Sequence, residues 1–193
     1  MNRNYGFKFG IDDQGSSSNP CSEVYRGPSA FSEPETAAMR DFVKGLPNMK
    51  VAFNFHAWGP LFIYPFMYDN AGNSLLTSQF PEAYQFYESL SKSIGLSSDW
   101  KIGNAMQTIE YRANGDASDW MLGELGIFAL SVELGGVTTG SRSFFISNPN
   151  HLMNEVMTNE PWIYKTMLYL LDTIECTENG PLVIGQTDGA DTV

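Results

Sequence analysis

Helical spacing of apolar residues begins after Ser32. Ser32 and Glu35 are spaced as in a capping box, in which two side chains satisfy the first amide groups of a helix. The apolar residues that follow at helical intervals are Met39, Phe42, Val43 and Leu46. Either Gly45 or Pro47 ends the segment, because both residue types interrupt helices. The pattern therefore predicts a helix between the capping box and these two residues.

Strand-like and helix-like patterns alternate along the rest of the chain. Alternating or continuous apolar runs predict strands at Val51–His56, Leu61–Pro65, Met106–Tyr111 and Gly126–Leu134. Helices are expected at Pro81–Ile94, Asp116–Leu125 and His151–Glu175, the last one kinked or restarted at Pro161. Polar sequence rich in turn residues predicts loops at residues 1–31, 67–81 and 135–150. This alternation indicates an α/β fold.

The composition fits one globular domain and excludes several classes of protein. The chain has 193 residues, 42% of them hydrophobic, which is enough for a core. A formal net charge of −11 argues against binding to nucleic acid or anionic membranes. No apolar run reaches the roughly 18 residues of a membrane span, and residues 1–6 lack the apolar core of a signal peptide. Cys21 and Cys176 can pair or stay free, and the oligomeric state is not predicted.

Two polar residues stand at the ends of apolar strands. His56 is either a histidine satisfied by a backbone carbonyl or a metal ligand at a strand's carboxyl end, where sites of α/β proteins gather. The strand pattern alone favours the structural role. Glu133 is either already in solvent or buried, and burial would raise its pKa toward the range of a general base.

A third feature is the pair Asn2 and Arg3. An Arg guanidinium beside an amide can hold a carboxylate through charge-assisted hydrogen bonds. On these residues alone, a polar terminus without a function is the simpler interpretation.

Five segments that contain the residues above or stand near them follow one another in a fixed order. They are Asn2-Arg3-Asn4-Tyr5, Ser17 to Glu23, Phe55-His56-Ala57-Trp58, Tyr111 to Trp120 and Ser131-Val132-Glu133-Leu134. In this order they resemble the zinc carboxypeptidases of the A/B type, peptidase family M14. The resemblance covers residues 1–175, which we expect to be part of a catalytic domain followed by a polar tail at 176–193. It implies the C-terminal part of a mixed-sheet fold with flanking helices.

The resemblance also implies a role for each matching residue. Asn2 and Arg3 would grip the terminal carboxylate of a peptide, and Tyr111 would close over it. Ser118 falls at the bottom of the pocket for the substrate's side chain, with Asp116 close enough to add negative charge. Neither residue decides which side chain is preferred.

Catalysis follows from the same resemblance. His56 would be one of three Zn²⁺ ligands, and Glu133 the general base in metal-assisted hydrolysis of the last peptide bond. The implied function is a zinc-dependent metallocarboxypeptidase whose partners are peptide or protein C-termini.

The chain lacks several features that the family carries upstream of the Asn-Arg pair. The family's other two zinc ligands lie on a His-x-x-Glu stretch upstream of the Asn-Arg pair, and nothing here matches it. His151 lies far downstream and is interpreted as a residue at a helix start. The cysteine that pairs with the counterpart of Cys21 in related proteins also lies upstream. We therefore expect an N-terminally incomplete carboxypeptidase that is inactive by itself, because a catalytic zinc needs three protein ligands.

Two alternatives remain beside the enzyme. The chain is a pseudoenzyme that binds C-termini without zinc, or an unstable remnant whose open sheet edge favours aggregation. By resemblance only, we expect an extracellular or vacuolar/lysosomal location.

Overall fold

The computed structural model describes residues 2–57, 59–93 and 100–134, and beyond them only 149–150, 153, 164–165, 174–175 and 183–184. Its centre is a four-stranded mixed sheet in the order β1-β4-β2-β3. β1 (Val51–Ala57) runs parallel to β4 (Phe128–Leu134), and β4 runs antiparallel to β2 (Leu61–Ile63). β3 (Lys101–Gly103) pairs in parallel with β2. The predicted α/β class and mixed sheet are confirmed.

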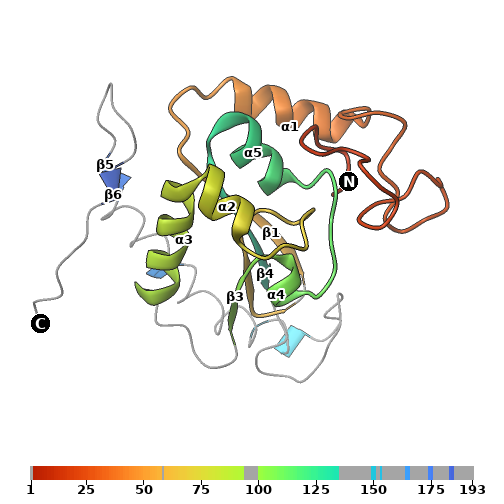
Figure 1. The fold of residues 1–193 in the computed structure, drawn as a ribbon. Helices are drawn as coiled ribbons and strands as arrows, with labels where there is room; N and C mark the ends of the chain where they lie inside the picture. The colour runs from red at the N-terminus through yellow and green to blue at the C-terminus, as the bar shows by residue number, and fades with distance from the viewer. Residues whose placement is uncertain are drawn as a thin grey trace, which may run out of the picture.

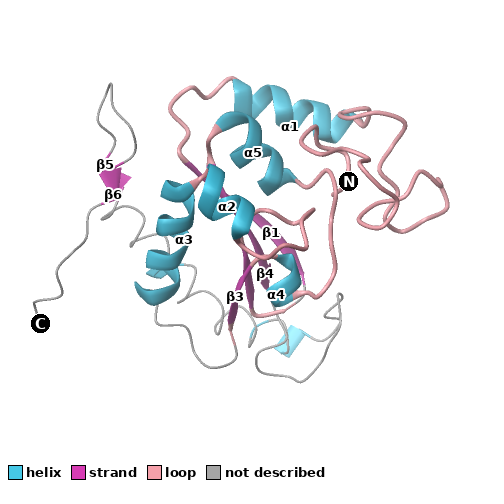
Figure 2. Ribbon diagram, in the orientation of Figure 1, coloured by secondary structure: helices cyan, strands magenta, loops and turns pink. Residues whose placement is uncertain are grey.

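Five helices accompany this sheet in the described ranges. They are α1 (Pro34–Lys44), α2 (Ser74–Gln79), α3 (Pro81–Ser93), α4 (Ala105–Thr108) and α5 (Ala117–Leu125). In Figure 1, α1 lies beside α5, and α2 lies beside α3, while the N-terminal loops lie beside the end of α1 at which the helix begins. The two-residue strands β5 (Ile174–Glu175) and β6 (Val183–Ile184) pair antiparallel away from the main sheet (Figure 2).

The two faces of the sheet bury different side chains. Phe128, Leu130 and Val132 of β4 join α3 in the larger cluster, where Phe86, Tyr87 and Leu90 are almost fully buried. Ala52 and Ala129 instead meet α1 and α5 in a second cluster. Tyr87 also donates its hydroxyl to the Ala129 carbonyl at 2.9 Å, so the larger cluster satisfies its buried polar group.

The N-terminal segment is irregular, as predicted, and the side chain of Asn4 holds it together. In residues 2–33 the structure has no helix or strand, only an isolated bridge between Ser17 and Tyr25. Asn4 is fully buried, and its amide donates to the carbonyls of Arg26 at 2.6 Å and Ser29 at 2.8 Å. Its oxygen accepts from the Thr36 hydroxyl at 2.5 Å, which fixes the loop to the first turn of α1.

Several predicted elements are confirmed, with small shifts at their ends. The strand predicted at Val51–His56 is β1, Leu61–Pro65 contains β2, and Gly126–Leu134 contains β4. The helices predicted at Pro81–Ile94 and Asp116–Leu125 are α3 and α5.

Other predicted elements are wrong. The strand predicted at Met106–Tyr111 is not present, because a capping box between Asn104 and Gln107 starts the short helix α4 there. The loop predicted at 67–81 contains α2, and β3 was not predicted. The final helix does not reach Glu175, since Ile174 and Glu175 form β5; most of the range predicted for it lies outside the described residues.

The capping box predicted at Ser32 is also wrong. Glu33 is the N-cap of α1, and no side chain caps it. Ser32 is used differently: its hydroxyl lies 2.9 Å from a Glu33 carboxylate oxygen and 3.0 Å from the Asn4 amide. On α1, Val43 is buried, whereas Met39 and Phe42 are 42% and 62% exposed.

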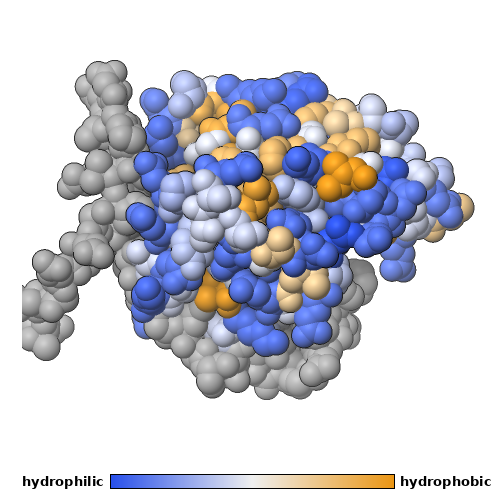
Figure 3. All heavy atoms as spheres, in the orientation of Figure 1, coloured by the Kyte–Doolittle hydropathy of each residue, from blue (hydrophilic) through white to orange (hydrophobic). Residues whose placement is uncertain are grey.

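The surface of the described residues is mostly polar. Hydrophilic residues cover most of the face drawn in Figure 3, and apolar residues lie on it in small groups. None of the helices in the described ranges has the length and apolar character that crossing a membrane requires.

Candidate active site

The site is built on the carboxyl ends of two neighbouring parallel strands. His56 of β1 and Glu133 of β4 are partners in the strand register. Because side chains alternate along a strand, both lie on the same face as Asn54 and Ser131, the face covered by α5. Both side chains are only partly buried. Pairing of these strands therefore brings together two residues that are far apart in the sequence.

Each of these two residues has a buried polar atom without a partner. Among the described residues, His56 Nε2 and Glu133 Oε2 are inaccessible to solvent and make no hydrogen bond. Buried polar groups in proteins are nearly always satisfied, so two orphaned atoms in register indicate a place for a further ligand.

Burial also sets the charge of the two groups. It raises the pKa of Glu133 to about 7, helped by the negative charge of Asp116 and opposed by Arg3. For His56, burial lowers the pKa, and Asp116 partly offsets this. Near neutral pH the imidazole is therefore neutral, and the Glu133 carboxyl is close to half ionised. These are the states in which an imidazole binds metal and a carboxylate accepts protons.

Asp116 is fully buried and caps α5. Its carboxylate accepts from the amides of Ser118 at 2.7 Å and Asp119 at 3.3 Å. Burial raises the pKa of Asp116, while these backbone hydrogen bonds and the charge of Arg3 oppose the rise. The Asp-x-Ser pattern ahead of an apolar helix is an N-cap signal that sequence reasoning overlooked.

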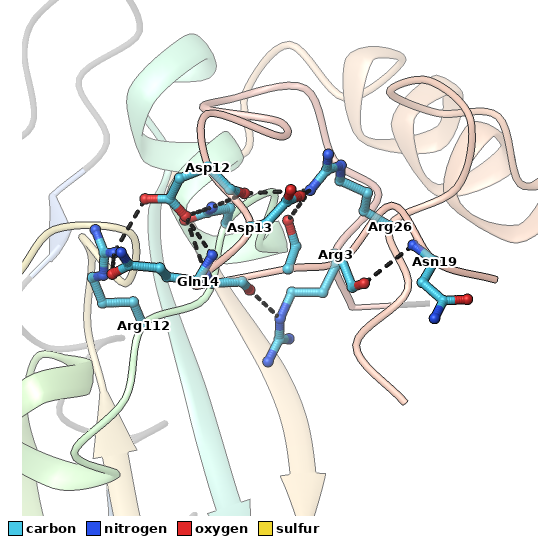
Figure 4. A network of polar contacts seen from close by, with 11 residues as sticks. Arg3, Asp12, Asp13, Gln14, Asn19, Arg26 and Arg112 are labelled. Carbon is cyan, nitrogen blue, oxygen red and sulfur yellow. Dashed lines mark hydrogen bonds and ion pairs between the residues drawn. The ribbon is translucent and has the colours of Figure 1, made fainter. Parts of the chain in front are cut away.

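Asn2 and Arg3 lie beside this carboxylate. With its amide oriented to suit both neighbours, Asn2 donates to Asp116 Oδ2 at 3.0 Å and accepts from Arg3 Nη1 at 3.3 Å. Arg3 donates through Nη1 to the Asn2 carbonyl at 2.8 Å, and through Nε to the Gly15 carbonyl at 3.0 Å (Figure 4). The guanidinium is thus oriented by backbone carbonyls.

Tyr111 lies on the loop after α4 and points outward. Its side chain is 54% exposed and lines an open cavity of about 310 Å³. The other residues of this cavity are Gln14, Asn70, Met106, Glu110 and Arg112. None of the other predicted site residues lines it.

Ser118 lies in the first turn of α5 and is fully buried. Its hydroxyl is 2.9 Å from that of Ser131. Ser131 lies two residues before Glu133 on β4, so both side chains are on the same face of the sheet. The structure therefore places Ser118 under the site, with its hydroxyl already satisfied.

The donors near His56 only partly fit a zinc ion. His56 presents an unpartnered nitrogen, as a ligand would, and thiolate, imidazole or carboxylate groups are what zinc selects. However, among the described residues no three His, Cys, Asp or Glu side chains come together as a metal-binding group. His151 lies outside the described residues.

Comparisons with known proteins place the chain among carboxypeptidases. The zinc carboxypeptidase family of peptidase M14 matches residues 1–159. Carboxypeptidase B of Astacus astacus is 33% identical over 153 residues, which are 75% of this chain and 46% of that protein. Carboxypeptidase A1 of Bos taurus is 35% identical over 133 residues, 69% of this chain and 30% of that protein. The chain thus spans less than half the length of these curated relatives.

Solved structures agree with this relationship. Carboxypeptidase A from Helicoverpa armigera is 25% identical, with a TM-score of 0.62 over 87% of this chain and 41% of that chain. Bovine thrombin-activatable fibrinolysis inhibitor, solved in complex with a tick carboxypeptidase inhibitor, has a TM-score of 0.67 at 23% identity. That similarity covers 90% of this chain and 57% of that chain, and it supports the fold alone.

Proposed function

Because this chain belongs to the zinc carboxypeptidase family, we propose that it supplies the carboxylate clamp and the general base for removing the last residue of a peptide. The observation that carries the proposal is the register pair of His56 and Glu133. In the part of the chain that the structure describes, each has a buried atom without a partner, and burial raises the pKa of Glu133 to about 7. A structural pair on two core strands would have no reason to leave both atoms unsatisfied.

Arg3 and Asn2 are the proposed clamp for the terminal carboxylate. The Arg3 guanidinium is held through Nε and Nη1 by two carbonyls, so its orientation is fixed before a ligand arrives. A fixed guanidinium binds a carboxylate without a large loss of side-chain entropy. Recognition of a free carboxylate is what restricts cleavage to the last peptide bond.

Glu133 is the proposed general base. With a pKa of about 7, it takes a proton from the attacking water and returns it to the leaving amine at neutral pH. His56 is the proposed zinc ligand, and zinc would supply Lewis-acid activation of the water and the scissile carbonyl. In a protein that carries the remaining ligands, Glu133→Gln should lower kcat by about a hundredfold to ten-thousandfold.

The clamp is tested by binding to the 193-residue chain itself. An N-acetylated dipeptide with a free carboxylate should bind measurably by calorimetry, and the same dipeptide amidated at its C-terminus should not. Arg3→Met should abolish this difference, while Arg40→Gln, a surface arginine paired with Asp41, should keep it. Equal binding of both peptides would contradict the proposed function.

The metal part of the proposal has its own test. The described residues offer zinc one ligand, so we expect the chain alone to bind zinc weakly and to cleave no peptide. Stoichiometric zinc in the purified chain after dialysis against a chelator would overturn this expectation. The second candidate is a module that binds C-termini, and the Arg3 guanidinium held by two backbone carbonyls supports it as well. A carboxylate preference without turnover in a protein that carries the remaining ligands would favour this second candidate.

The same proposal includes the domain organisation: residues 1–175 are part of a catalytic domain, and residues 176–193 are a polar tail. It also includes Tyr111 as the residue that closes over the substrate and Ser118 as the floor of the side-chain pocket. The proposed location is extracellular or vacuolar/lysosomal.

A further inference from the structure

One backbone carbonyl links the candidate clamp to the loop that carries Tyr111. The Gly15 oxygen accepts from Arg3 Nε at 3.0 Å and from the Asn114 amide at 3.1 Å. Both donors therefore share one acceptor, and a shift of Gly15 would move the guanidinium and the loop together.

The turn that presents this carbonyl is held by Asp12. Its Oδ1 accepts from the amides of Gln14 and Gly15 at 3.0 and 3.2 Å, which fixes the turn. The same oxygen accepts from Asn114 Nδ2 at 2.7 Å, and Oδ2 lies 3.1 Å from Arg112 Nη2. The Arg112 side chain, next to Tyr111, also donates to Gln14 Oε1 (Figure 4). Asp12 thus connects its own turn to both ends of the segment from Arg112 to Asn114.

These contacts are partly shielded from water. The side chains of Asp12 and Arg112 are 30% and 19% exposed, and Asn114 is fully buried. Such a pair is screened less than an ion pair on an open surface, so it can hold a loop.

Glycine allows the two segments to lie against each other. Gly115 has a φ of +68°, and a Cβ there would stand 2.5 Å from the Arg3 carbonyl oxygen. The Gly115 carbonyl accepts from the Tyr5 amide at 3.0 Å. Backbone therefore packs on backbone between the clamp segment and the Tyr111 loop, without an intervening side chain.

We infer that the Asp12–Gly15 turn is a positioning element that couples the Arg3 guanidinium to the Tyr111 loop (residues 111–115) through the Asp12–Arg112 pair. The part of this inference that concerns carboxylate binding rests on the proposed function. Asp12 and Arg112 touch no substrate in this role. They fix the distance between the group that binds the carboxylate and the loop that carries Tyr111.

Two variants of the 193-residue chain test the coupling. Asp12→Asn keeps an oxygen for the turn amides and removes the charge facing Arg112, while Arg112→Met keeps the side-chain length. Amide hydrogen exchange at Asn114 should accelerate about tenfold in each variant. The double variant should exchange little faster than either single variant, because both lose the same interaction. Lys92→Gln, which removes an exposed i,i+4 pair with Glu88, is the matched control and should change nothing at Asn114.

Binding separates positioning from mere loop stability. The Kd of the N-acetylated dipeptide with a free carboxylate should rise about threefold to tenfold in both variants, while the amidated dipeptide should still show no measurable binding. Faster exchange without any change in this Kd would overturn the positioning role, and unchanged exchange at Asn114 would overturn the coupling. If the unmodified chain shows no carboxylate preference, the proposed function fails, and exchange at Asn114 alone decides whether the two segments are coupled.

Discussion

The two faces of the central sheet differ, although the same strands supply both. On β4, Phe128, Leu130 and Val132 point into the aromatic cluster against α3, whereas Ser131 and Glu133 point toward α5. The α3 face is closed by large apolar side chains. On the α5 face the strands present small and polar groups, and among the described residues two buried atoms there have no partner. The comparison shows that one strand can stabilise the fold with alternate residues and carry the polar groups of the candidate site on the others.

The energetic roles of the two faces differ for a physical reason. Burying apolar area on the α3 face stabilises the fold by about 25 cal/mol per Å². Burying a carboxyl on the α5 face costs free energy unless it is paired, and the raised pKa of Glu133 is a measure of that cost. We therefore expect substitutions on the two faces to change the free energy of unfolding by different amounts and in different directions.

The largest effect is expected on the α3 face. Leu130 is fully buried, so Leu130→Ala should lower the free energy of unfolding by about 3–4 kcal/mol through lost burial and a new cavity. Urea unfolding followed by circular dichroism measures this change. The control is Leu46→Ala, because Leu46 is 42% exposed and should lose less than about 1 kcal/mol. Equal losses in the two variants would remove the distinction between the faces.

On the α5 face, Glu133→Gln should stabilise the metal-free chain, and only at higher pH. The folded pKa of Glu133, about 7, lies above its ordinary value of 4.5, so the folded state binds more protons between these pH values. The unmodified chain therefore loses stability as pH rises from about 4.5 to about 7, and glutamine does not titrate. The difference in free energy of unfolding between the variant and the unmodified chain should therefore grow by about 1–2 kcal/mol between pH 5 and pH 8. This value is smaller than the full pKa shift implies, because Glu133 is partly exposed to solvent.

Urea unfolding at both pH values, in buffer with a chelator, measures the advantage of Glu133→Gln. Glu82→Gln, at an exposed position on α3, controls for the loss of one charge. His56 is present in all of these chains, so its own titration contributes equally to each. If the stability difference between Glu133→Gln and the unmodified chain does not depend on pH, Glu133 is not buried as described.

A smaller effect is expected beneath the site. Ser118→Ala should cost about 1 kcal/mol, because it removes the hydrogen bond between buried hydroxyls at 2.9 Å. The double variant with Ser131→Ala should cost less than the sum of the two single variants, since both lose the same bond. Additive losses, measured by thermal unfolding, would mean that the two hydroxyls do not interact.

The smallest effect is expected where the α3 face emerges into solvent. Phe55 lies on the same side of β1 as Phe53, with ring centroids 6.0 Å apart, but it is 47% exposed. Phe55→Ala should therefore cost less than about 1 kcal/mol in urea unfolding. A loss as large as that of Leu130→Ala would mean that the aromatic core extends to the end of β1.

Local patterns predicted the long elements well and the short ones poorly. β1, β4 and α3 have enough alternating or helical positions to be recognised from spacing alone. The apolar pattern of Met106–Tyr111 predicts a strand, but the N-cap Asn104 lies before this segment and forms a capping box with Gln107 inside it, which starts a helix instead. At Ser32 the sequence has the spacing of a capping box, but the structure does not form one. The Ser32 hydroxyl instead accepts a hydrogen bond from the side-chain amide of Asn4.

The candidate site was predicted only in part for a similar reason. His56, Glu133 and Arg3 were named from the sequence, and the structure gathers them around Asp116. The part played by Asp12, Gln14 and Arg112 has no signal in the sequence. Asp12 and Arg112 are far apart in the chain, and nothing in either local pattern points to the other.

The sequence by itself determined which residues form the main strands and helices, because hydrophobic spacing is a local property that survives without the fold. It also determined the family, through short segments in a fixed order. Only the tertiary structure decided which polar groups meet, which are buried, and how burial shifts their pKa values. Those quantities depend on distance and water exclusion in space, and parallel pairing of β1 with β4 brings His56 and Glu133 together from positions 77 residues apart in the chain.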